Sequence, residues 1–340
     1  MKAAKLVNRG KLALLEEDPP SINSSDEVLL RMVEVGICGS DLHYFRLGAI
    51  GHQIVKYPFT IGHEGLAIVQ EIGQKVMTLK PGDKVVFNPA ISCLQCDQCF
   101  AGRPHTCRYL KFLGCPGELE GCLKELIVMP AQNCFPVKED IWPLAVLVEP
   151  LAIALYAAQM AGEIKNKKVA IFGCGPIGLC SLFHCYLAGA SLIIAIDKVE
   201  ARLEAARRLG AHWVDNPELK KEVNEIWAAQ FDLAFDCCGD QQALNQAVSI
   251  LKPGGKLIII GIPEIDQISF DPHLLRRKEI TIYNVRRQNN FFLQAIEFLQ
   301  KNKEALKSLI THHFPLTDIQ KAFDLASNYE DGAIKVTIKI

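Results

Sequence analysis

The chain has 340 residues, which is long for a single hydrophobic core and favours two domains. Apolar residues make up 49% of it, and 37 basic residues nearly balance 38 acidic ones, which leaves a net charge of −1. This balance argues against nucleic acid as a partner and against a charged interaction tail, and it favours a globular protein that acts on a small molecule.

The N-terminal residues carry no signal-peptide pattern, and the absence of eighteen consecutive apolar residues predicts no membrane-spanning helix. The chain has 13 cysteines without a secretory signal, which favours a reducing compartment where thiols bind metals or lie in cores. We therefore expect a cytoplasmic protein with neither a membrane nor a nucleic-acid partner.

The first 150 residues are predicted to be rich in β-strands. Strand-like runs lie at 27–35, 66–72, 84–87 and 123–128, with Gly and Pro between them. After Glu149-Pro150 the pattern changes, beginning with a helical run at 151–160. From there the sequence alternates between the two periodicities, which marks a second region of different fold.

In this second region short apolar strands are expected at 168–172, 192–196, 231–236, 255–261 and 280–285. Helical patterns lie between them, for example at 199–209 and 241–251. Such alternation predicts an α/β domain with a doubly wound parallel sheet of the Rossmann type. The last 50 residues are expected to hold two helices and a terminal strand at 335–340.

A glycine-rich loop follows the strand at 168–172. Gly173, Gly175 and Gly178, with Pro176 and Ile177 between them, form the pattern G-x-G-x-x-G at the start of a helix. Gly173 permits a tight turn, Gly175 lets the backbone approach a pyrophosphate, and Gly178 allows close packing of helix and strand. The pyrophosphate would lie at the positive end of the helix, so the loop predicts a dinucleotide site.

Asp197 ends the next strand, nineteen residues after Gly178. Its carboxylate suits the ribose hydroxyls of the adenosine and would repel a 2′-phosphate, which favours NAD over NADP. Lys198 and Arg202 follow closely and weaken this preference, and we include both among the expected cofactor-binding residues. The alternative is a glycine-rich structural turn in an unrelated α/β protein.

Four cysteines lie within fifteen residues: Cys93, Cys96, Cys99 and Cys107. Spacings of two residues let sulfurs converge on one ion, and four thiolates satisfy the tetrahedral preference of a structural zinc. A pair of disulfides or an iron–sulfur cluster is the alternative. The pattern favours a structural zinc held by a lobe at about 88–110.

A second set of possible ligands is dispersed along the chain. Cys38, His63, Glu64 and Glu149 supply a thiolate, an imidazole and carboxylates. Each has an ordinary interpretation alone, because a lone cysteine is usually a core residue and a lone His-Glu is more often a surface pair. Together they suit a catalytic zinc with three protein ligands and one exchangeable position.

The order of these motifs resembles the medium-chain zinc-dependent alcohol dehydrogenases over essentially the full length, and most of all their sorbitol (L-iditol) and L-idonate dehydrogenase branch. The matching stretches, besides the four-cysteine lobe, are GICGSDLHYF (36–45), IGHEG (61–65), PGDKV (81–85), VEPLA (148–152) and GCGPIG (173–178). The complete lobe moves the chain towards the bacterial polyol and L-idonate side of this group.

The resemblance implies roles for individual residues. Cys38 and His63 would bind the catalytic zinc, with Glu64 as a third ligand in some states, and Glu149 would lie beside the metal or hold its water. Asp41 would orient His63. Ser40 would receive the substrate proton and His43 would pass it towards solvent.

The implied activity is oxidation of a secondary alcohol to a ketone by hydride transfer from a zinc-bound alkoxide to the nicotinamide. The implied substrate is a polyol or sugar derivative such as sorbitol, L-iditol or xylitol, and the implied cofactors are two zinc ions per chain and NAD. The resemblance also implies a GroES-like catalytic domain at 1–151, a Rossmann domain at 152–286, a return to the catalytic domain at 287–340, and a homodimer or homotetramer.

Several residues keep two interpretations. Arg286 and Arg287 are either solvated loop charges or ligands of hydroxyls, a carboxylate or a phosphate. Tyr44 either lines the pocket, as the family suggests, or packs under the loop. Lys335 matches a basic residue that approaches the pyrophosphate in relatives, and a surface lysine is the alternative.

Three other functions stay open on the sequence alone. One is the dehydrogenation of an acidic or phosphorylated sugar alcohol, as in L-idonate dehydrogenase, and a second is L-threonine 3-dehydrogenase. A non-catalytic NAD-binding sensor is the third. Its usual sign would be loss of a metal ligand or relay residue, and this chain retains all of them: Cys38, Ser40, His43, His63, Glu64 and Glu149.

Overall fold

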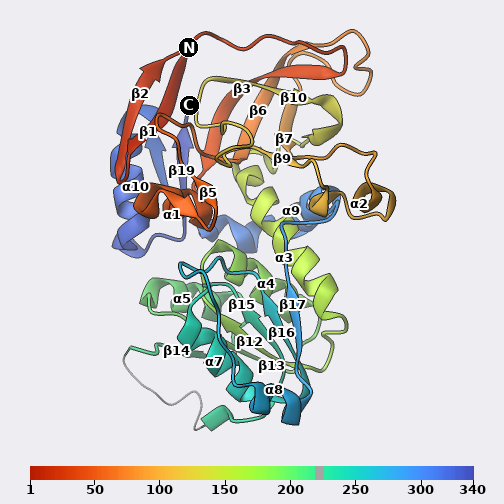
Figure 1. The fold of residues 1–340 in the computed structure, drawn as a ribbon, viewed down its shortest axis with the longest axis vertical. Coiled ribbons are helices and arrows are strands. Elements are labelled where there is room, and N and C mark those ends of the chain that lie inside the picture. The colour runs from red at the N-terminus through yellow and green to blue at the C-terminus, as the bar shows by residue number, and fades with distance from the viewer. Residues whose placement is uncertain (219–225) are drawn as a thin grey trace. The chain divides into compact units, whose positions relative to one another are not determined.

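The computed structural model describes residues 1–218 and 226–340. The chain forms two compact units, which are described separately (Figure 1). Unit 1 comprises Met1–Glu149 and Phe292–Ile340, and unit 2 comprises Pro150–Phe291. The C-terminal segment therefore returns to the unit in which the chain begins.

Unit 1 is built around a mainly antiparallel sheet. Within the described residues its strand order is β11-β7-β6-β3-β19-β18, and β10 also pairs with β3. These strands are β3 (Glu27–Gly36), β6 (Glu64–Ile72), β7 (Lys84–Phe87), β10 (Leu126–Pro130), β11 (Cys134–Pro136), β18 (Ile310–Pro315) and β19 (Lys335–Lys339). The last two strands extend the sheet from the far end of the sequence.

Smaller elements complete unit 1. Its two-stranded sheets pair β1 (Lys2–Asn8) with β2 (Lys11–Glu16), β4 (Ala49–Ile50) with β5 (Gln53–Ile54), and β8 (Ala90–Ile91) with β9 (Lys111–Phe112). Its helices are α1 (Gly39–Leu47), α2 (Asp97–Phe100), α9 (Phe292–Leu306) and α10 (Ile319–Asn328). Phe323 of α10 lies 5.4 Å, ring to ring, from Phe45 of α1, so the C-terminal segment supports the helix that follows Cys38.

The central strand β3 shows why this sheet forms. Val28, Leu30 and Met32 alternate along it and are at most 1% exposed, as expected for one face of a half-buried strand. Near its C-terminal end Gly36 pairs with Glu64 of β6 on one side and with Thr337 of β19 on the other. Residues from three distant parts of the sequence therefore meet where the chain leaves β3.

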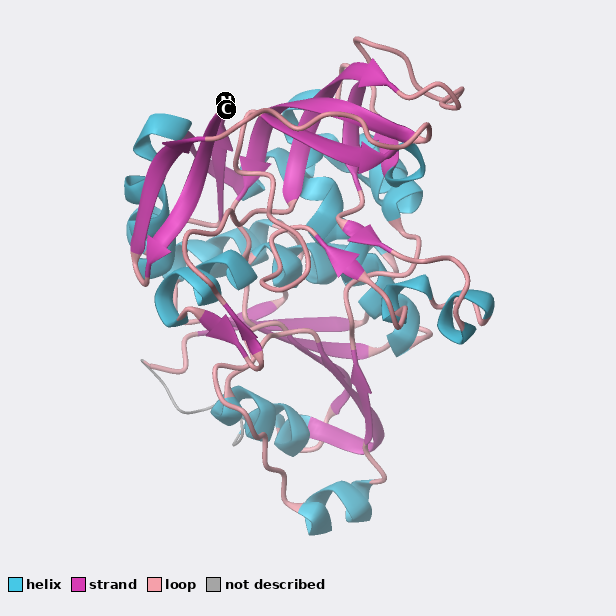
Figure 2. Cartoon of the chain, turned by 45° about the horizontal axis from the view of Figure 1, so that its top comes forward, coloured by secondary structure: helices cyan, strands magenta, loops and turns pink. Residues whose placement is uncertain are grey.

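Unit 2 contains the parallel sheet that the sequence predicts, in the order β14-β13-β12-β15-β16-β17. The strands are β12 (Lys168–Phe172), β13 (Leu192–Ile196), β14 (Trp213–Asp215), β15 (Phe231–Asp236), β16 (Leu251–Ile259) and β17 (Thr281–Asn284). Helices α4 (Pro176–Leu187), α5 (Glu200–Arg208), α7 (Gln241–Ile250) and α8 (Pro272–Lys278) pack against it (Figure 2). The predicted α/β fold with a Rossmann sheet is confirmed.

Helix α3 (Val148–Ala161) follows directly on a 3-10 helix, Trp142–Leu147. The combined segment Trp142–Ala161 is apolar and long enough to cross a membrane by length and composition, but 78% of its apolar window is buried in the fold. The rule of eighteen consecutive apolar residues misses it because Glu149 and Pro150 interrupt the run. Such burial is typical of a core helix.

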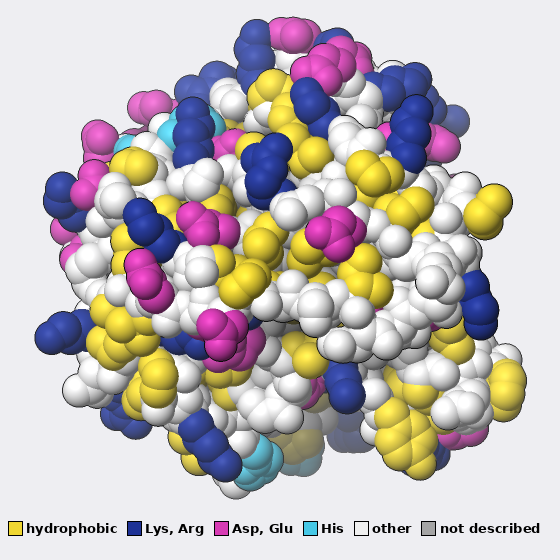
Figure 3. All heavy atoms as spheres, turned by 90° about the horizontal axis from the view of Figure 1, so that it is seen from above, with side chains coloured by type: hydrophobic (Ala, Val, Ile, Leu, Met, Phe, Trp, Pro, Cys, Tyr) yellow, Lys and Arg dark blue, Asp and Glu magenta, His cyan; other side chains and the backbone are white. Residues whose placement is uncertain are grey.

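On the face shown in Figure 3, acidic and basic side chains are interspersed.

Candidate active site

Three of the dispersed residues come together in unit 1. The ligand atoms of Cys38, His63 and Glu64 all lie within 4.8 Å of one another, and His63 and Glu64 are buried. Cys38 is the N-cap residue of α1, so it lies directly before the first turn of this helix. A thiolate, an imidazole and a carboxylate that converge in a buried place match the ligands of a catalytic zinc, so the residues fit this ion.

Asp41 contacts the backbone or the side chain beside two of these three residues. Its Oδ2 accepts a hydrogen bond from the Cys38 N–H at 3.0 Å, and its Oδ1 accepts one from the Gly62 N–H at 3.0 Å. The same Oδ1 lies 3.6 Å from Nδ1 of His63, and Asp41 is fully buried. One carboxylate thus fixes the backbone beside both ligands and faces the ring nitrogen that would not bind metal.

The surroundings of His63 favour the protonated, charged ring when no metal is bound to it. Burial lowers the pKa of His63, but the charges of Asp41 and Cys38 outweigh this and raise it well above 6.5. The ring also lies 5.2 Å, centroid to centroid, from that of Phe112 on β9. His63 is therefore confined between an acidic partner and an aromatic face.

Glu64 has a partner that the sequence does not predict. Its Oε2 forms an ion pair with Nζ of Lys335, and each side chain is 1% exposed. Lys335 also donates a hydrogen bond to the backbone oxygen of Ile37 at 3.0 Å. The surface-lysine alternative is therefore wrong, because pairing of β19 with β3 places residue 335 beside the ligand group. The role of Lys335 at the pyrophosphate stays a prediction.

The other expected catalytic residues lie in the same unit. Glu149 is 5% exposed, at the start of α3, and among the described residues it is not part of the three-ligand group. Its charge nevertheless acts on Lys335, whose pKa it helps to raise against the effect of burial. Ser40 and His43 lie three residues apart on α1, which places them on one face of the helix.

Tyr44 is buried, with 4% of its surface exposed, and its ring belongs to the core of unit 1. Its hydroxyl donates to Oε1 of Gln53 at 3.2 Å, and Gln53 in turn donates to Glu118 at 3.1 Å. The packing interpretation therefore describes the ring, while the hydroxyl enters a polar group. The role of Tyr44 in substrate binding stays a prediction.

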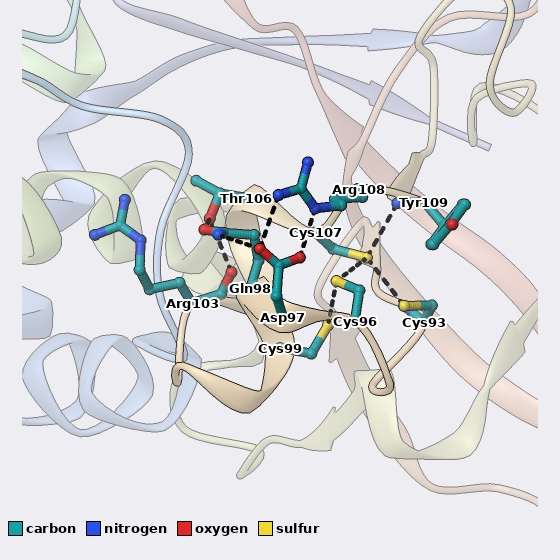
Figure 4. A network of polar contacts seen from close by, with 10 residues as sticks. All are labelled: Cys93, Cys96, Asp97, Gln98, Cys99, Arg103, Thr106, Cys107, Arg108 and Tyr109. Atoms are coloured by element: carbon teal, nitrogen blue, oxygen red, sulfur yellow. Dashed lines mark hydrogen bonds and ion pairs between the residues drawn. The ribbon is translucent and has the colours of Figure 1, made fainter.

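The four cysteines of the lobe also converge (Figure 4). The sulfur of Cys107 lies 3.4 Å from that of Cys93, and the sulfur of Cys96 lies 3.6 Å from Cys99 and 3.8 Å from Cys107. A tetrahedral zinc with Zn–S bonds of about 2.3 Å requires sulfurs about 3.8 Å apart. The spacing fits zinc, and all four cysteines are free thiols, contrary to the disulfide alternative.

The lobe shifts the pKa values of two of its thiols in opposite directions. Burial and the neighbouring sulfur of Cys96 raise the pKa of the Cys99 thiol to about 11. Backbone N–H groups of Arg108 and Cys99 lower the pKa of the Cys96 thiol to about 6. Arg108 itself pairs with Asp97, from Nε to Oδ1 at 2.5 Å, which joins the start of α2 to the residue after Cys107. A lobe of this kind is ready to bind a metal without opening an exchangeable position.

The glycine-rich loop of unit 2 joins β12 to α4. Gly173 has φ +88°, which a side chain would strain, and a Cβ at Gly178 would overlap the backbone oxygen of Gly173. A Cβ at Gly175 would meet no atom within 4 Å. Gly178 is thus required by packing, whereas the fold itself leaves open space at Gly175, as an approaching pyrophosphate demands.

Asp197 is bound more firmly to the loop than the sequence indicates. Its Oδ2 accepts a hydrogen bond from the Cys174 N–H at 2.6 Å, and its Oδ1 accepts one from the Val199 N–H at 2.8 Å. The carboxylate therefore shapes the glycine-rich loop itself. Lys198 is exposed and Arg202 is half-buried on the adjoining turn and helix.

The two arginines after β17 differ from each other. Arg286 is exposed, whereas Arg287 is half-buried and has φ +54°. A positive φ is uncommon for a residue with a side chain and is often found at functional loops. The structure separates the two residues without assigning either to a ligand.

Comparison with known proteins agrees with this geometry. Residues 24–139 match the alcohol dehydrogenase GroES-like domain, and residues 176–301 match the zinc-binding dehydrogenase family. Sorbitol dehydrogenase of Bacillus subtilis is 33% identical over 343 residues, which cover 99% of this chain and 97% of that protein.

Two solved structures from Escherichia coli are similar along the whole chain. L-idonate 5-dehydrogenase has a TM-score of 0.91 at 25% identity, covering 100% of this chain and 98% of that one. Galactitol-1-phosphate dehydrogenase has a TM-score of 0.89 at 27% identity and covers 100% of both. Together with the two family matches, this similarity shows that the chain belongs to the medium-chain zinc-dependent alcohol dehydrogenases, oxidoreductases that use zinc and a nicotinamide dinucleotide.

Proposed function

We propose that this protein oxidises a secondary alcohol of a polyol or sugar-derived substrate to the ketone, with NAD as the hydride acceptor. The observation that carries the proposal is the buried convergence of Cys38, His63 and Glu64, with Asp41 behind them. A protein that only senses NAD has no need of such a group. We therefore favour an enzyme over a non-catalytic sensor.

Cys38 and His63 would hold the catalytic zinc, with Glu64 and Glu149 as nearby carboxylates. When bound there, zinc acts as a Lewis acid that makes the substrate hydroxyl acidic near neutral pH. Ser40 would accept the hydroxyl proton and His43, one turn further along α1, would move it towards solvent. Cys93, Cys96, Cys99 and Cys107 would hold a second, structural zinc.

The glycine-rich loop would bind the dinucleotide. The expected contacts are Gly173, Gly175, Pro176, Ile177, Gly178, Asp197, Lys198, Arg202 and Lys335. The open space at Gly175 supports a pyrophosphate at the N-terminus of α4, and the acidic Asp197 supports NAD over NADP.

A neutral polyol such as sorbitol, L-iditol or xylitol is the substrate class we favour. Its support is the similarity to sorbitol dehydrogenase of Bacillus subtilis. An acidic or phosphorylated sugar alcohol is the second candidate. Half-buried Arg287 supports it, as does similarity to L-idonate and galactitol-1-phosphate dehydrogenases.

We further propose a cytoplasmic homodimer or homotetramer. The proposed domains are a GroES-like catalytic domain at 1–151 with a zinc lobe at about 88–110, a Rossmann domain at 152–286, and a return to the catalytic domain at 287–340. The two compact units support this division.

The test is formation of NADH or NADPH with a panel of sorbitol, xylitol, L-iditol, galactitol, L-idonate, galactitol 1-phosphate and L-threonine, with and without a zinc chelator. We expect chelator-sensitive turnover of a neutral polyol with NAD. Turnover confined to an acid, a phosphate or L-threonine would overturn the substrate class but not the chemistry. No turnover by zinc-replete protein would overturn the proposal.

A further inference from the structure

Four residues of unit 1 form a polar cluster: Tyr44, Gln53, Cys115 and Glu118. Gln53 lies in the middle of this cluster. Its Oε1 accepts a hydrogen bond from the Tyr44 hydroxyl at 3.2 Å, and its Nε2 donates to Oε1 of Glu118 at 3.1 Å and to the sulfur of Cys115. The oxygen and the nitrogen of the Gln53 amide are both engaged within the cluster, so the orientation of this side chain is fixed.

Two observations place the polar cluster near the candidate metal centre. Along α1, Tyr44 follows Ser40 by four residues, so the two side chains lie on one face of the helix. In the loop after β9, Cys115 shares a small apolar core with Phe112, whose ring lies 5.2 Å, centroid to centroid, from that of His63. The cluster is therefore one helical turn from Ser40 and one aromatic residue from His63.

The cluster has a buried part and an accessible part. Tyr44 and Cys115 are 4% and 3% exposed, whereas Gln53 and Glu118 are half-buried. A carboxylate has sites for about four hydrogen bonds, so the bond from Gln53 orients Glu118 and leaves capacity for another donor. Tyr44 and Cys115 thus form a fixed base, and Glu118 is the charged group that a bound molecule can contact.

An oriented carboxylate at this place suits a substrate with several hydroxyl groups. A simple secondary alcohol has its one hydroxyl on the reacting carbon, whereas a polyol has further hydroxyls that can donate to a carboxylate. A site built to bind a hydroxyl discriminates strongly against an analogue that lacks it, because the polar groups of the site then stay unpaired. The cluster has the chemistry to select between these two classes of alcohol.

We propose that Glu118, oriented by Gln53, binds a hydroxyl beyond the reacting carbon and so makes the protein specific for polyols over simple secondary alcohols. This inference rests on the proposed function, since it assumes that the reacting carbon lies at the zinc of Cys38 and His63. Glu118 contacts the substrate, and Gln53 is a positioning residue that acts through Glu118.

The first measurement is the ratio of kcat/KM for xylitol to kcat/KM for 2-butanol, with NAD and zinc-replete protein. Glu118→Gln should lower this ratio about tenfold and Glu118→Ala about 100-fold, because a substrate hydroxyl loses a charged acceptor. Gln53→Leu should lower it about tenfold, because Glu118 loses the donor that orients it. In all three variants the loss should lie mainly in a raised KM for xylitol.

The second measurement needs no turnover. Xylitol or sorbitol is titrated into the complex of the protein with NADH, which cannot accept a hydride, and the change in NADH fluorescence is followed. Glu118→Ala should weaken binding of both polyols by about the factor seen in the ratio, roughly 100-fold. Wild-type protein that binds these polyols through Glu118 without oxidising them would overturn the proposed function and leave this inference standing.

Glu120→Gln is the matched control. Glu120 lies two residues after Glu118, but its carboxylate pairs with Lys5 at 3.0 Å and with Lys124 at 3.4 Å. Its removal should change neither the ratio nor polyol binding. An unchanged ratio in both Glu118 variants, an equal fall in Glu120→Gln, or no binding of either polyol by the wild type would overturn the inference.

Discussion

Asp41→Ala removes the carboxylate that joins the two best candidate zinc ligands. Asp41 accepts hydrogen bonds from the backbone N–H groups of Cys38 and Gly62, each at 3.0 Å. A hydrogen bond to a charged group contributes about 1.5–3 kcal/mol, so losing both should lower the free energy of unfolding of unit 1 by roughly 3–6 kcal/mol. Zinc affinity at the catalytic site should also fall by about 10–100-fold, because Asp41 faces the second ring nitrogen of His63.

The matched control is Asp240→Ala in unit 2. Asp240 also accepts two backbone N–H groups, from Gln242 and Ala243, but it does so as an N-cap of α7 that is exposed to solvent. Loss of such a cap costs about 1 kcal/mol, and zinc affinity should not change.

Both variants are measured by urea unfolding, by zinc competition with a chelator, and by hydrogen exchange of the amide of Gly62. Asp41→Ala should accelerate exchange at Gly62, and Asp240→Ala should leave it unchanged. Equal losses of stability in the two variants, or unchanged zinc affinity in Asp41→Ala, would refute the reasoning, because Asp41 would then be one buried polar residue among others.

Three further predictions follow from local geometry. Gly178→Ala should abolish NADH binding in a fluorescence titration and lower the thermal midpoint of unfolding, because its Cβ overlaps the backbone oxygen of Gly173. Gly175→Ala should weaken NADH binding and leave the thermal midpoint unchanged. Equal thermal midpoints in the two variants would contradict this. Cys96→Ser should remove one zinc per chain by elemental analysis and lower the thermal midpoint; full zinc content would count against a structural site. Lys278→Met should destabilise unit 2 by roughly 2 kcal/mol in urea unfolding, because the Lys278 ammonium donates to three backbone oxygens at the end of α7. A loss of unfolding free energy below the error of the method would show that these hydrogen bonds do not stabilise unit 2.

Most of unit 2 is predictable from sequence for a simple reason. Strands β12, β13 and β15 coincide with the predicted runs at 168–172, 192–196 and 231–236, since strands buried on both faces of a parallel sheet are short, nearly continuous apolar runs. The predicted runs at 255–261 and 280–285 differ by a few residues from β16 and β17, and β14 is not predicted. For example, β16 begins at Leu251, because Lys252-Pro253-Gly254-Gly255 lies within an irregular strand and not in a loop before it.

Strands β1, β2 and β18 are not predicted from the sequence. The segment Ile310–Pro315 contains two histidines and ends in proline, so its apolar pattern is weak, and it becomes a strand through pairing with β19. In such segments the pairing partner decides the conformation more than local propensity does.

Some features of the candidate site can also be predicted from the sequence, and others depend on how distant strands pair. The glycine pattern is a local feature of sequence, so Gly173 and Gly178 are predicted from spacing. Cys38 and His63 are far apart in the sequence, and their role as zinc ligands is predicted from the resemblance to the family. The ion pair between Glu64 and Lys335 depends on the register of three strands from distant parts of the chain, which no local pattern encodes. The hydrogen bond that Asp197 accepts from the Cys174 N–H in the glycine-rich loop is missed for the same reason.

Zinc held by Cys38 and His63 would make the substrate hydroxyl acidic, so that NAD can oxidise the alcohol, and Cys38→Ser tests this role most directly. Zinc content, NADH binding and turnover of the best polyol are measured on one preparation of this variant. We predict loss of one zinc per chain, NADH affinity within about threefold of the wild type because the glycine-rich loop is intact, and no detectable turnover. Turnover at the wild-type rate in a variant shown to lack the catalytic zinc would contradict the account.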